Sequence, residues 1–172
     1  MNPLLAKLQP YPFERLKKLF SGVTPPSELP HISLGIGEPK HATPGFILDA
    51  LQGALDGGLS VYPATAGEPA LREACAVWLH KRYDLQLDPK SQILPVNGTR
   101  EALFALAQTV IDPKPGATVI CPNPFYQIYE GAALLSGATP YFVPSDPERN
   151  FACDWSSVPE SVWQHTQLIY VC

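Results

Sequence analysis

The pattern of hydrophobic positions changes character near residue 92. Before that point, apolar residues recur at helical spacing, and this spacing predicts a helix over residues 12–20, one after Pro44 and one opening at Pro69. From there on, short continuous apolar runs alternate with helical patterns. The runs predict strands at 92–96, 117–121, 139–143 and 167–172. The patterns between them predict helices at 98–111, 125–136 and 157–164.

Continuous apolar runs such as 118–121 and 168–171 are typical of strands that are covered on both faces. Strands that alternate with helices indicate crossover connections between parallel neighbours. The pattern therefore predicts an α/β fold with a mostly parallel sheet.

Local signals place the ends of the two helices before residue 92. Thr43 is expected to be an N-cap, with Pro44 at the first helical position. Two glycines, Gly57 and Gly58, are expected to end that helix. The helix that opens at Pro69 is expected to run to about Arg82.

Composition excludes several classes of function. The 172 residues carry a net charge of −4 with scattered Lys and Arg, so no nucleic-acid partner is expected. No apolar run approaches the ~20 residues of a membrane span, and no secretory signal is visible. The four cysteines form no Cys-x-x-Cys pair and accompany no histidine cluster. The sequence therefore favours a cytoplasmic protein without a membrane partner or a metal site.

The most informative turn is the junction Asn97-Gly98-Thr99, between an apolar run and a helical pattern. Glycine lets the backbone approach a ligand closely. The free N–H groups of the following helical turn, with the helix dipole behind them, suit an anion such as a phosphate. A plain tight connection between two elements is the alternative, and spacing alone leaves both open.

Two glycines near residue 36 are a weaker signal. Gly35 and Gly37 begin a dinucleotide-binding pattern, but Lys40 stands where its third glycine belongs, so a Rossmann site is disfavoured. Gly37 remains a position where backbone could approach a ligand, or a plain turn.

Aromatic residues follow one predicted strand end. Tyr126 lies between Phe125 and Tyr129, just past the strand at 117–121, where ligands of α/β sheets bind. A ring there could stack on a planar cofactor or simply pack. Tyr62, in a loop before a proline, is a weaker candidate. None of the four histidines has the neighbours of a catalytic triad.

Four segments occur in a characteristic order along the chain. They are 34–39 (LGIGEP), 62–72 (YPATAGEPALR), 97–103 (NGTREAL) and 122–129 (PNPFYQIY). This order resembles the N-terminal part of class I aminotransferases, which use pyridoxal 5′-phosphate and have the fold-type I architecture. Residues 8–16 (LQPYPFERL) are similar to the start of succinyldiaminopimelate aminotransferases of bacterial lysine synthesis.

The resemblance implies roles for several residues. Gly98, Thr99 and Arg100 would hold the cofactor phosphate at the helix N-terminus, and Tyr126 would stack on the pyridine ring. The other implied roles involve the substrate or the neighbouring subunit.

Two further positions have implied roles that reach beyond this turn. Gly37 would place its backbone near the α-carboxylate of the substrate. Tyr62 would cross the interface of a homodimer to the phosphate of the neighbouring subunit's cofactor.

The resemblance also implies a domain division. Residues 1–40 would form an N-terminal arm and contribute to the small domain. Residues 41–172 would be the N-terminal part of the large domain, a three-layer αβα structure with a mostly parallel sheet that is incomplete at the C-terminus.

No catalytic residue is expected in this chain, because the family's Schiff-base lysine is expected beyond Cys172. That lysine usually has Ser or Thr three residues before it, and none of the seven lysines here does. The chain alone is therefore expected to be inactive.

The expected activity of the full protein is transamination, the transfer of an amino group between an amino acid and a 2-oxo acid. The expected substrates are N-succinyl-LL-2,6-diaminopimelate and 2-oxoglutarate. The sequence leaves alternatives open: an aspartate, alanine or aromatic aminotransferase, or a non-catalytic α/β module that binds an anion.

Overall fold

The computed structural model describes residues 3–29 and 31–172, and the chain forms two compact units. One unit combines Met1–Gly22 with Val96–Cys172, and the other is Val23–Pro95. Each is described by itself. In the described part of the chain, no helix has the length and apolar character that crossing a membrane requires.

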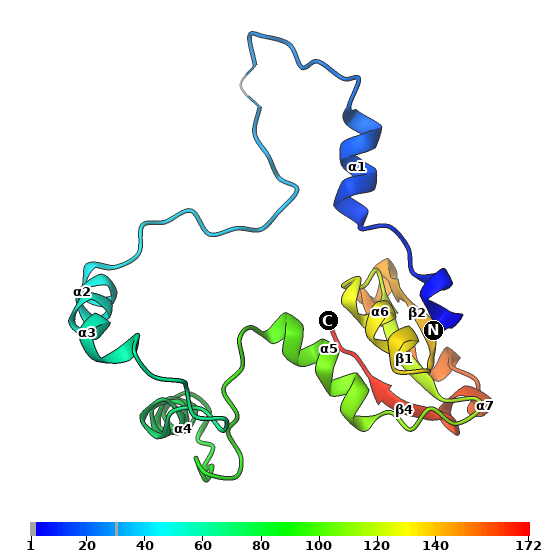
Figure 1. Ribbon diagram of the computed structural model, residues 1–172. Coiled ribbons are helices and arrows are strands. Elements are labelled where there is room, and N and C mark those ends of the chain that lie inside the picture. Colours follow the sequence, from blue (N-terminus) through cyan, green and yellow to red (C-terminus); the bar gives the residue numbers. More distant parts are fainter. Residues whose placement is uncertain (1–2, 30) are drawn as a thin grey trace. The chain divides into compact units, whose positions relative to one another are not determined.

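The first unit is built on a four-stranded sheet (Figure 1). Its strands are β1 (Thr118–Asn123), β2 (Thr139–Asp146), β3 (Ala152–Cys153) and β4 (Thr166–Ile169), in the spatial order β3-β2-β1-β4. The central strand β1 runs parallel to both β2 and β4, and only the two-residue β3 is antiparallel to its neighbour. The predicted mostly parallel sheet is confirmed.

Both faces of the sheet are covered. Val119 and Cys121 pack against α5 (Thr99–Val110) and α6 (Ile128–Leu135), while the intervening Ile120 joins a second cluster. That cluster includes Val158 and Trp163, from the segment that holds η3 (Trp155–Ser157) and α7 (Glu160–Trp163). Because successive strand side chains point to opposite faces, the apolar run of β1 supplies both clusters. The three-layer αβα arrangement is confirmed.

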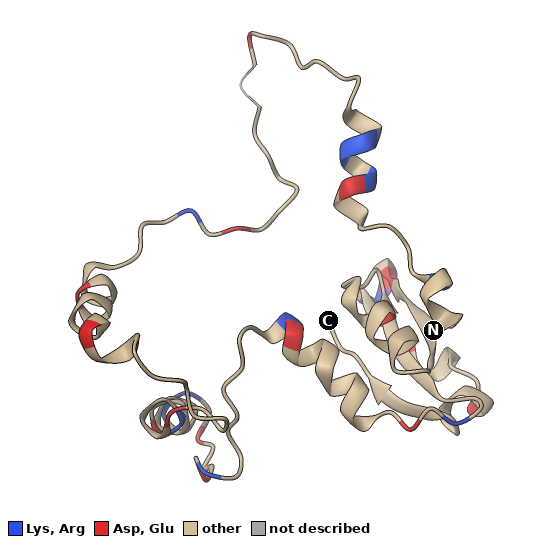
Figure 2. Ribbon diagram, in the orientation of Figure 1, with Lys and Arg blue, Asp and Glu red and all other residues tan. Residues whose placement is uncertain are grey.

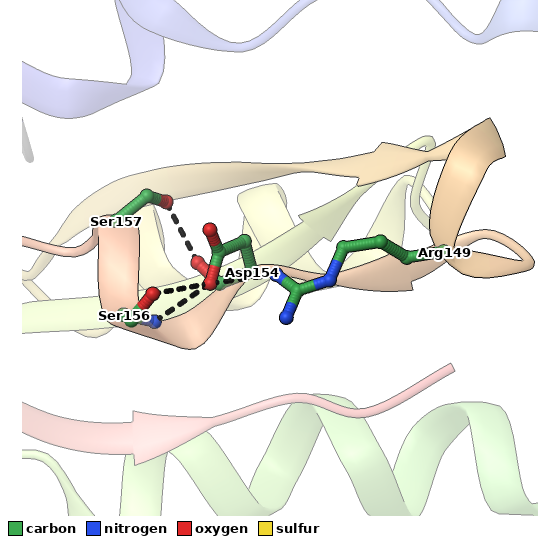
Figure 3. A network of polar contacts seen from close by, with 4 residues as sticks. All are labelled: Arg149, Asp154, Ser156 and Ser157. Carbon is green, nitrogen blue, oxygen red and sulfur yellow. Dashed lines mark hydrogen bonds and ion pairs between the residues drawn. The ribbon is translucent and has the colours of Figure 1, made fainter.

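A polar network ties the connection between β2 and η3 (Figure 3). Asp154 caps η3 by accepting a hydrogen bond from the backbone N–H of Ser156 at 3.1 Å. The same carboxylate oxygen pairs with Arg149, at the end of η2 (Pro147–Arg149), at an N–O distance of 2.8 Å. This network links the end of η2 to the start of η3.

The N-terminal residues of this unit form η1 (Pro3–Lys7) and the predicted helix α1 (Pro12–Phe20). Just after η1, Leu8 lies beside Gly131 of α6, as does Phe104 of α5, and a Cβ at Gly131 would meet both at ordinary van der Waals distance. The segment before α1 therefore packs on the helical layer.

The second unit contains α2 (Gly45–Gly53), α3 (Leu55–Gly58) and α4 (Pro69–Tyr83). The predicted N-cap Thr43 is wrong by one residue, because Pro44 is extended (φ −55°, ψ 138°) and itself precedes the first helical turn. The predicted single helix is also split after Gly53, a residue with low helix propensity. Helix α4 matches its prediction.

Two predictions from the apolar pattern are wrong. Residues 92–96 form no strand, since no described strand lies beside them to share backbone hydrogen bonds. The helix expected from Phe125 begins at Ile128 instead, because Phe125 is used in packing and stacks on Phe142 of β2 with ring centroids 4.8 Å apart. The strand predicted at 167–172 is the shorter β4.

Candidate functional site

The site begins at Gly98, which is the N-cap of α5. Its backbone has φ 106° and ψ 141°, a conformation that residues with a side chain rarely adopt. A Cβ atom there would also lie 3.0 Å from the Glu101 carboxylate. The turn that starts α5 therefore requires glycine.

The first turn of α5 leaves backbone donors free. The amides of Thr99, Arg100 and Glu101 have no carbonyl of the preceding turn to bind, and the Gly98 cap supplies no side-chain acceptor. These residues are exposed. With the positive end of the helix dipole behind them, the amides can receive an anion.

Arg100 and Tyr126 meet beside this turn, although 26 positions separate them. The Nε atom of Arg100 donates a hydrogen bond to the Tyr126 hydroxyl at 2.7 Å, and its guanidinium carbon is 5.9 Å from the ring centroid. That hydrogen bond is the main cause that raises the pKa of Arg100, with a smaller contribution from Tyr11. A permanent positive charge thus stands next to the free amides.

One acidic side chain opposes this charge. Glu101 follows Arg100 in the first turn, and Figure 2 shows a basic and an acidic residue side by side at the start of α5. The Glu101 side chain is exposed, and another rotamer would carry its carboxylate away from an incoming anion.

The ring of Tyr126 packs against a second tyrosine, Tyr129. It is half-buried and forms a T-shaped contact with the ring of Tyr129, with ring centroids 5.9 Å apart and an interplanar angle of 82°. The structure thus brings four of the predicted site residues to one end of α5: Gly98, Thr99, Arg100 and Tyr126. Gly37 and the fully exposed Tyr62 belong to the other unit, and their roles stay predictions.

Sequence reasoning missed Tyr11 and the groove beside it. A cavity of about 610 Å³ lies between the N-terminal segment and α6, lined among others by Tyr11, Arg15, Phe125, Glu130 and Phe142. Only tertiary packing brings these distant residues together, so no spacing along the chain could have shown it. In the described residues, no group of His, Cys, Asp or Glu side chains could hold a metal ion.

The chain is similar in sequence and structure to several known aminotransferases. The LL-diaminopimelate aminotransferase of Aquifex aeolicus is 35% identical over 141 residues, which cover 81% of this chain and 36% of that protein. The crystal structure of an aminotransferase from Neisseria meningitidis Z2491 matches all of this chain and 44% of its own, with a TM-score of 0.91 and 49% identity.

A third relative is the N-succinyldiaminopimelate aminotransferase of Mycobacterium tuberculosis. It matches 79% of this chain and 35% of its own, with a TM-score of 0.70 and 31% identity. The chain thus spans less than half the length of each of these three relatives. The profile of the family "Aminotransferase class I and II" matches residues 30–172. The chain belongs to the class I and II aminotransferase family.

Proposed function

We propose that this chain supplies the phosphate-anchoring and ring-stacking part of a pyridoxal-phosphate-dependent aminotransferase. Class I and II aminotransferases are enzymes that use this cofactor. The observation that carries the proposal is the end of α5, where the Gly98 turn, free amides, the Arg100 cation and the Tyr126 ring meet.

The chemistry of these groups fits the cofactor. Its phosphate is a dianion, for which unpaired helix amides and a guanidinium are good partners. Its pyridine ring is flat, and the half-buried Tyr126 offers a flat aromatic surface nearby. When bound, the cofactor serves as the electron sink for the carbanion formed at the substrate's Cα.

The chain's own residues then act by binding and orientation. Gly98 keeps the turn open, the amides from Thr99 onward and Arg100 bind the phosphate, and Tyr126 sets the plane of the ring. We further propose that Gly37 lies near the substrate carboxylate. Tyr62 would act across a homodimer interface, and the protein would be cytoplasmic.

For the substrate, we propose N-succinyl-LL-2,6-diaminopimelate as amino donor and 2-oxoglutarate as acceptor. Two relatives support a diaminopimelate-type substrate by their names, one for the free and one for the succinylated compound. The aspartate, alanine and aromatic alternatives remain outcomes of the test. We also propose that residues 1–40 form an N-terminal arm and contribute to the small domain, and that residues 41–172 form the N-terminal part of the large domain.

The test uses the full-length protein and its Arg100→Met variant. We expect wild type to bind pyridoxal 5′-phosphate and to transaminate diaminopimelate-type donors in a panel of amino acids. Arg100→Met should weaken cofactor binding at least tenfold, since a charge-assisted hydrogen bond contributes about 1.5–3 kcal/mol.

Arg149→Met is the matched control, because Arg149 is also an exposed arginine bonded to one side chain. It should bind the cofactor as wild type does. Phosphate binding without transamination of any donor would instead support the non-catalytic anion-binding module and refute the enzyme.

A further inference from the structure

Three tyrosines form a continuous chain of contacts behind the proposed site. The rings of Tyr126 and Tyr129 meet in a T-shaped contact, and Tyr129 stacks on Tyr170 with ring centroids 4.2 Å apart and planes inclined by 5°. The Tyr170 hydroxyl donates a hydrogen bond to the backbone carbonyl of Leu103 at 2.7 Å. Tyr129 and Tyr170 are buried, with 5% and 4% of their surface exposed.

This chain of contacts starts and ends on the same helix. Arg100, in the first turn of α5, bonds to Tyr126, and Leu103, one turn later, receives the bond from Tyr170. The circuit therefore runs from α5 through Tyr126, Tyr129 and Tyr170 and back to α5. It holds the Tyr126 ring against the start of α5 by two contacts, the hydrogen bond of its hydroxyl and the contact of its ring with Tyr129.

The chemical state of the buried rings supports this arrangement. Burial raises the pKa of Tyr129 and that of Tyr170 above the ordinary value for tyrosine. Both hydroxyls therefore stay protonated at neutral pH. Tyr170 consequently remains a hydrogen-bond donor to Leu103, and the circuit stays closed.

We propose that Tyr129 and Tyr170 are positioning residues that set the separation between the phosphate-binding turn of α5 and the stacking ring of Tyr126. The inference rests on the proposed function. A short linker joins the cofactor's phosphate to its flat ring. The phosphate can therefore reach the turn of α5 while the ring stacks on Tyr126 only when the turn and the Tyr126 ring are the right distance apart. Inorganic phosphate has no ring, so its binding affinity does not depend on that separation.

The test uses four variants of the full-length protein, and a fifth, Tyr126→Phe, serves only to assign a resonance. Tyr170→Phe removes the bond to Leu103 and keeps the stacked ring. Tyr129→Leu removes the ring in the middle, and Tyr129→Phe restores it. Tyr141→Phe is the matched control, because Tyr141 is half-buried in the core on the opposite face of the sheet.

The first measurement needs no cofactor. The ¹³C ring resonance of Tyr126 is followed by NMR in protein with labelled tyrosine and is assigned with Tyr126→Phe. We expect Tyr170→Phe and Tyr129→Leu to shift it, and Tyr129→Phe and Tyr141→Phe to leave it in place. An unmoved resonance in Tyr170→Phe overturns the inference, whatever the cofactor does.

The second measurement compares two ligands, pyridoxal 5′-phosphate and inorganic phosphate. Tyr170→Phe should weaken cofactor binding about fivefold, the equivalent of one ordinary hydrogen bond, and leave phosphate binding unchanged. Equal weakening of both ligands, or none relative to Tyr141→Phe, overturns the positioning role. A wild-type protein that binds no cofactor refutes the proposed function, a result distinct from an unmoved Tyr126 resonance.

Discussion

At the scale of single residues, Gly98 decides whether the turn before α5 can exist. Its φ of 106° costs a residue with a side chain about 1–3 kcal/mol, and Glu101 crowds the position where a Cβ would lie. We expect Gly98→Ala to destabilise the protein by that amount and to weaken phosphate binding severalfold. Thermal unfolding and phosphate titration measure the two effects.

Gly116→Ala is the control for this variant. Gly116 also has a positive φ (87°), and an added Cβ would lie 2.7 Å from the His165 side chain, but it lies in the loop before β1. It should lose stability and keep wild-type phosphate affinity. If both variants lost affinity equally, Gly98 would have no special role in binding.

Glu101 supplies a second prediction at this scale. Its carboxylate shares the first turn of α5 with the free amides and disfavours a second negative charge there. Glu101→Gln should therefore tighten the binding of inorganic phosphate about two- to fivefold at low salt, with a smaller gain at high salt. Weaker phosphate binding in this variant would contradict the proposed position of the anion.

Cys121 gives a prediction about pH. Burial in β1, and secondarily Glu130, raises the pKa of its thiol from 9.0 to about 12. The neutral thiol is therefore the form that folding favours, and its contribution to stability is complete below pH 9 and is lost between pH 9 and 12. The stability difference between wild type and Cys121→Ala should shrink over this interval in denaturant titrations. A constant difference would argue against the buried thiol.

At the scale of elements, a helix can form from its own residues, whereas a strand also needs a neighbouring strand. Pro69 and the apolar spacing after it predicted α4 closely, because helical hydrogen bonds join neighbours in sequence. The apolar run at 92–96 satisfied the same local criterion for a strand, but a strand exists only with a partner. Phe125 likewise fitted the helical pattern, but it stacks on Phe142 and lies outside the helix.

The side chain of Gln167 in β4 bonds to the backbone just after α5. Gln167 accepts a hydrogen bond from the Asp112 amide at 2.7 Å and donates one to the Asp112 carbonyl at 2.9 Å. Gln167→Leu should cost about 1 kcal/mol of unfolding free energy, because two exposed bonds are lost. Gln164→Leu should cost less, since the Gln164 side chain bonds to no described residue. Equal losses of unfolding free energy in the two variants would contradict a stabilising role for the bonds between Gln167 and Asp112.

At the scale of the whole molecule, the two units differ in how much they bury. The first has a core on both faces of its sheet, whereas the helices α2, α3 and α4 contain no buried residue. Local stability should differ accordingly. In hydrogen exchange of the 172-residue chain, amides of 119–121 should exchange far more slowly than those of 46–52. Similar rates in both segments would refute this difference.

Sequence alone determined the alternation of strands and helices, the parallel sheet, the glycine turn before α5 and the family resemblance. These follow from local periodicity, from the backbone freedom of glycine and from motif order, all of which can be seen along the chain without knowing which residues meet in space. Tertiary structure decided that Arg100 bonds to Tyr126, that a tyrosine circuit closes on Leu103, and that 92–96 has no strand partner. Those contacts join residues 26 or more positions apart or depend on a neighbouring strand, and packing alone chooses among such partners.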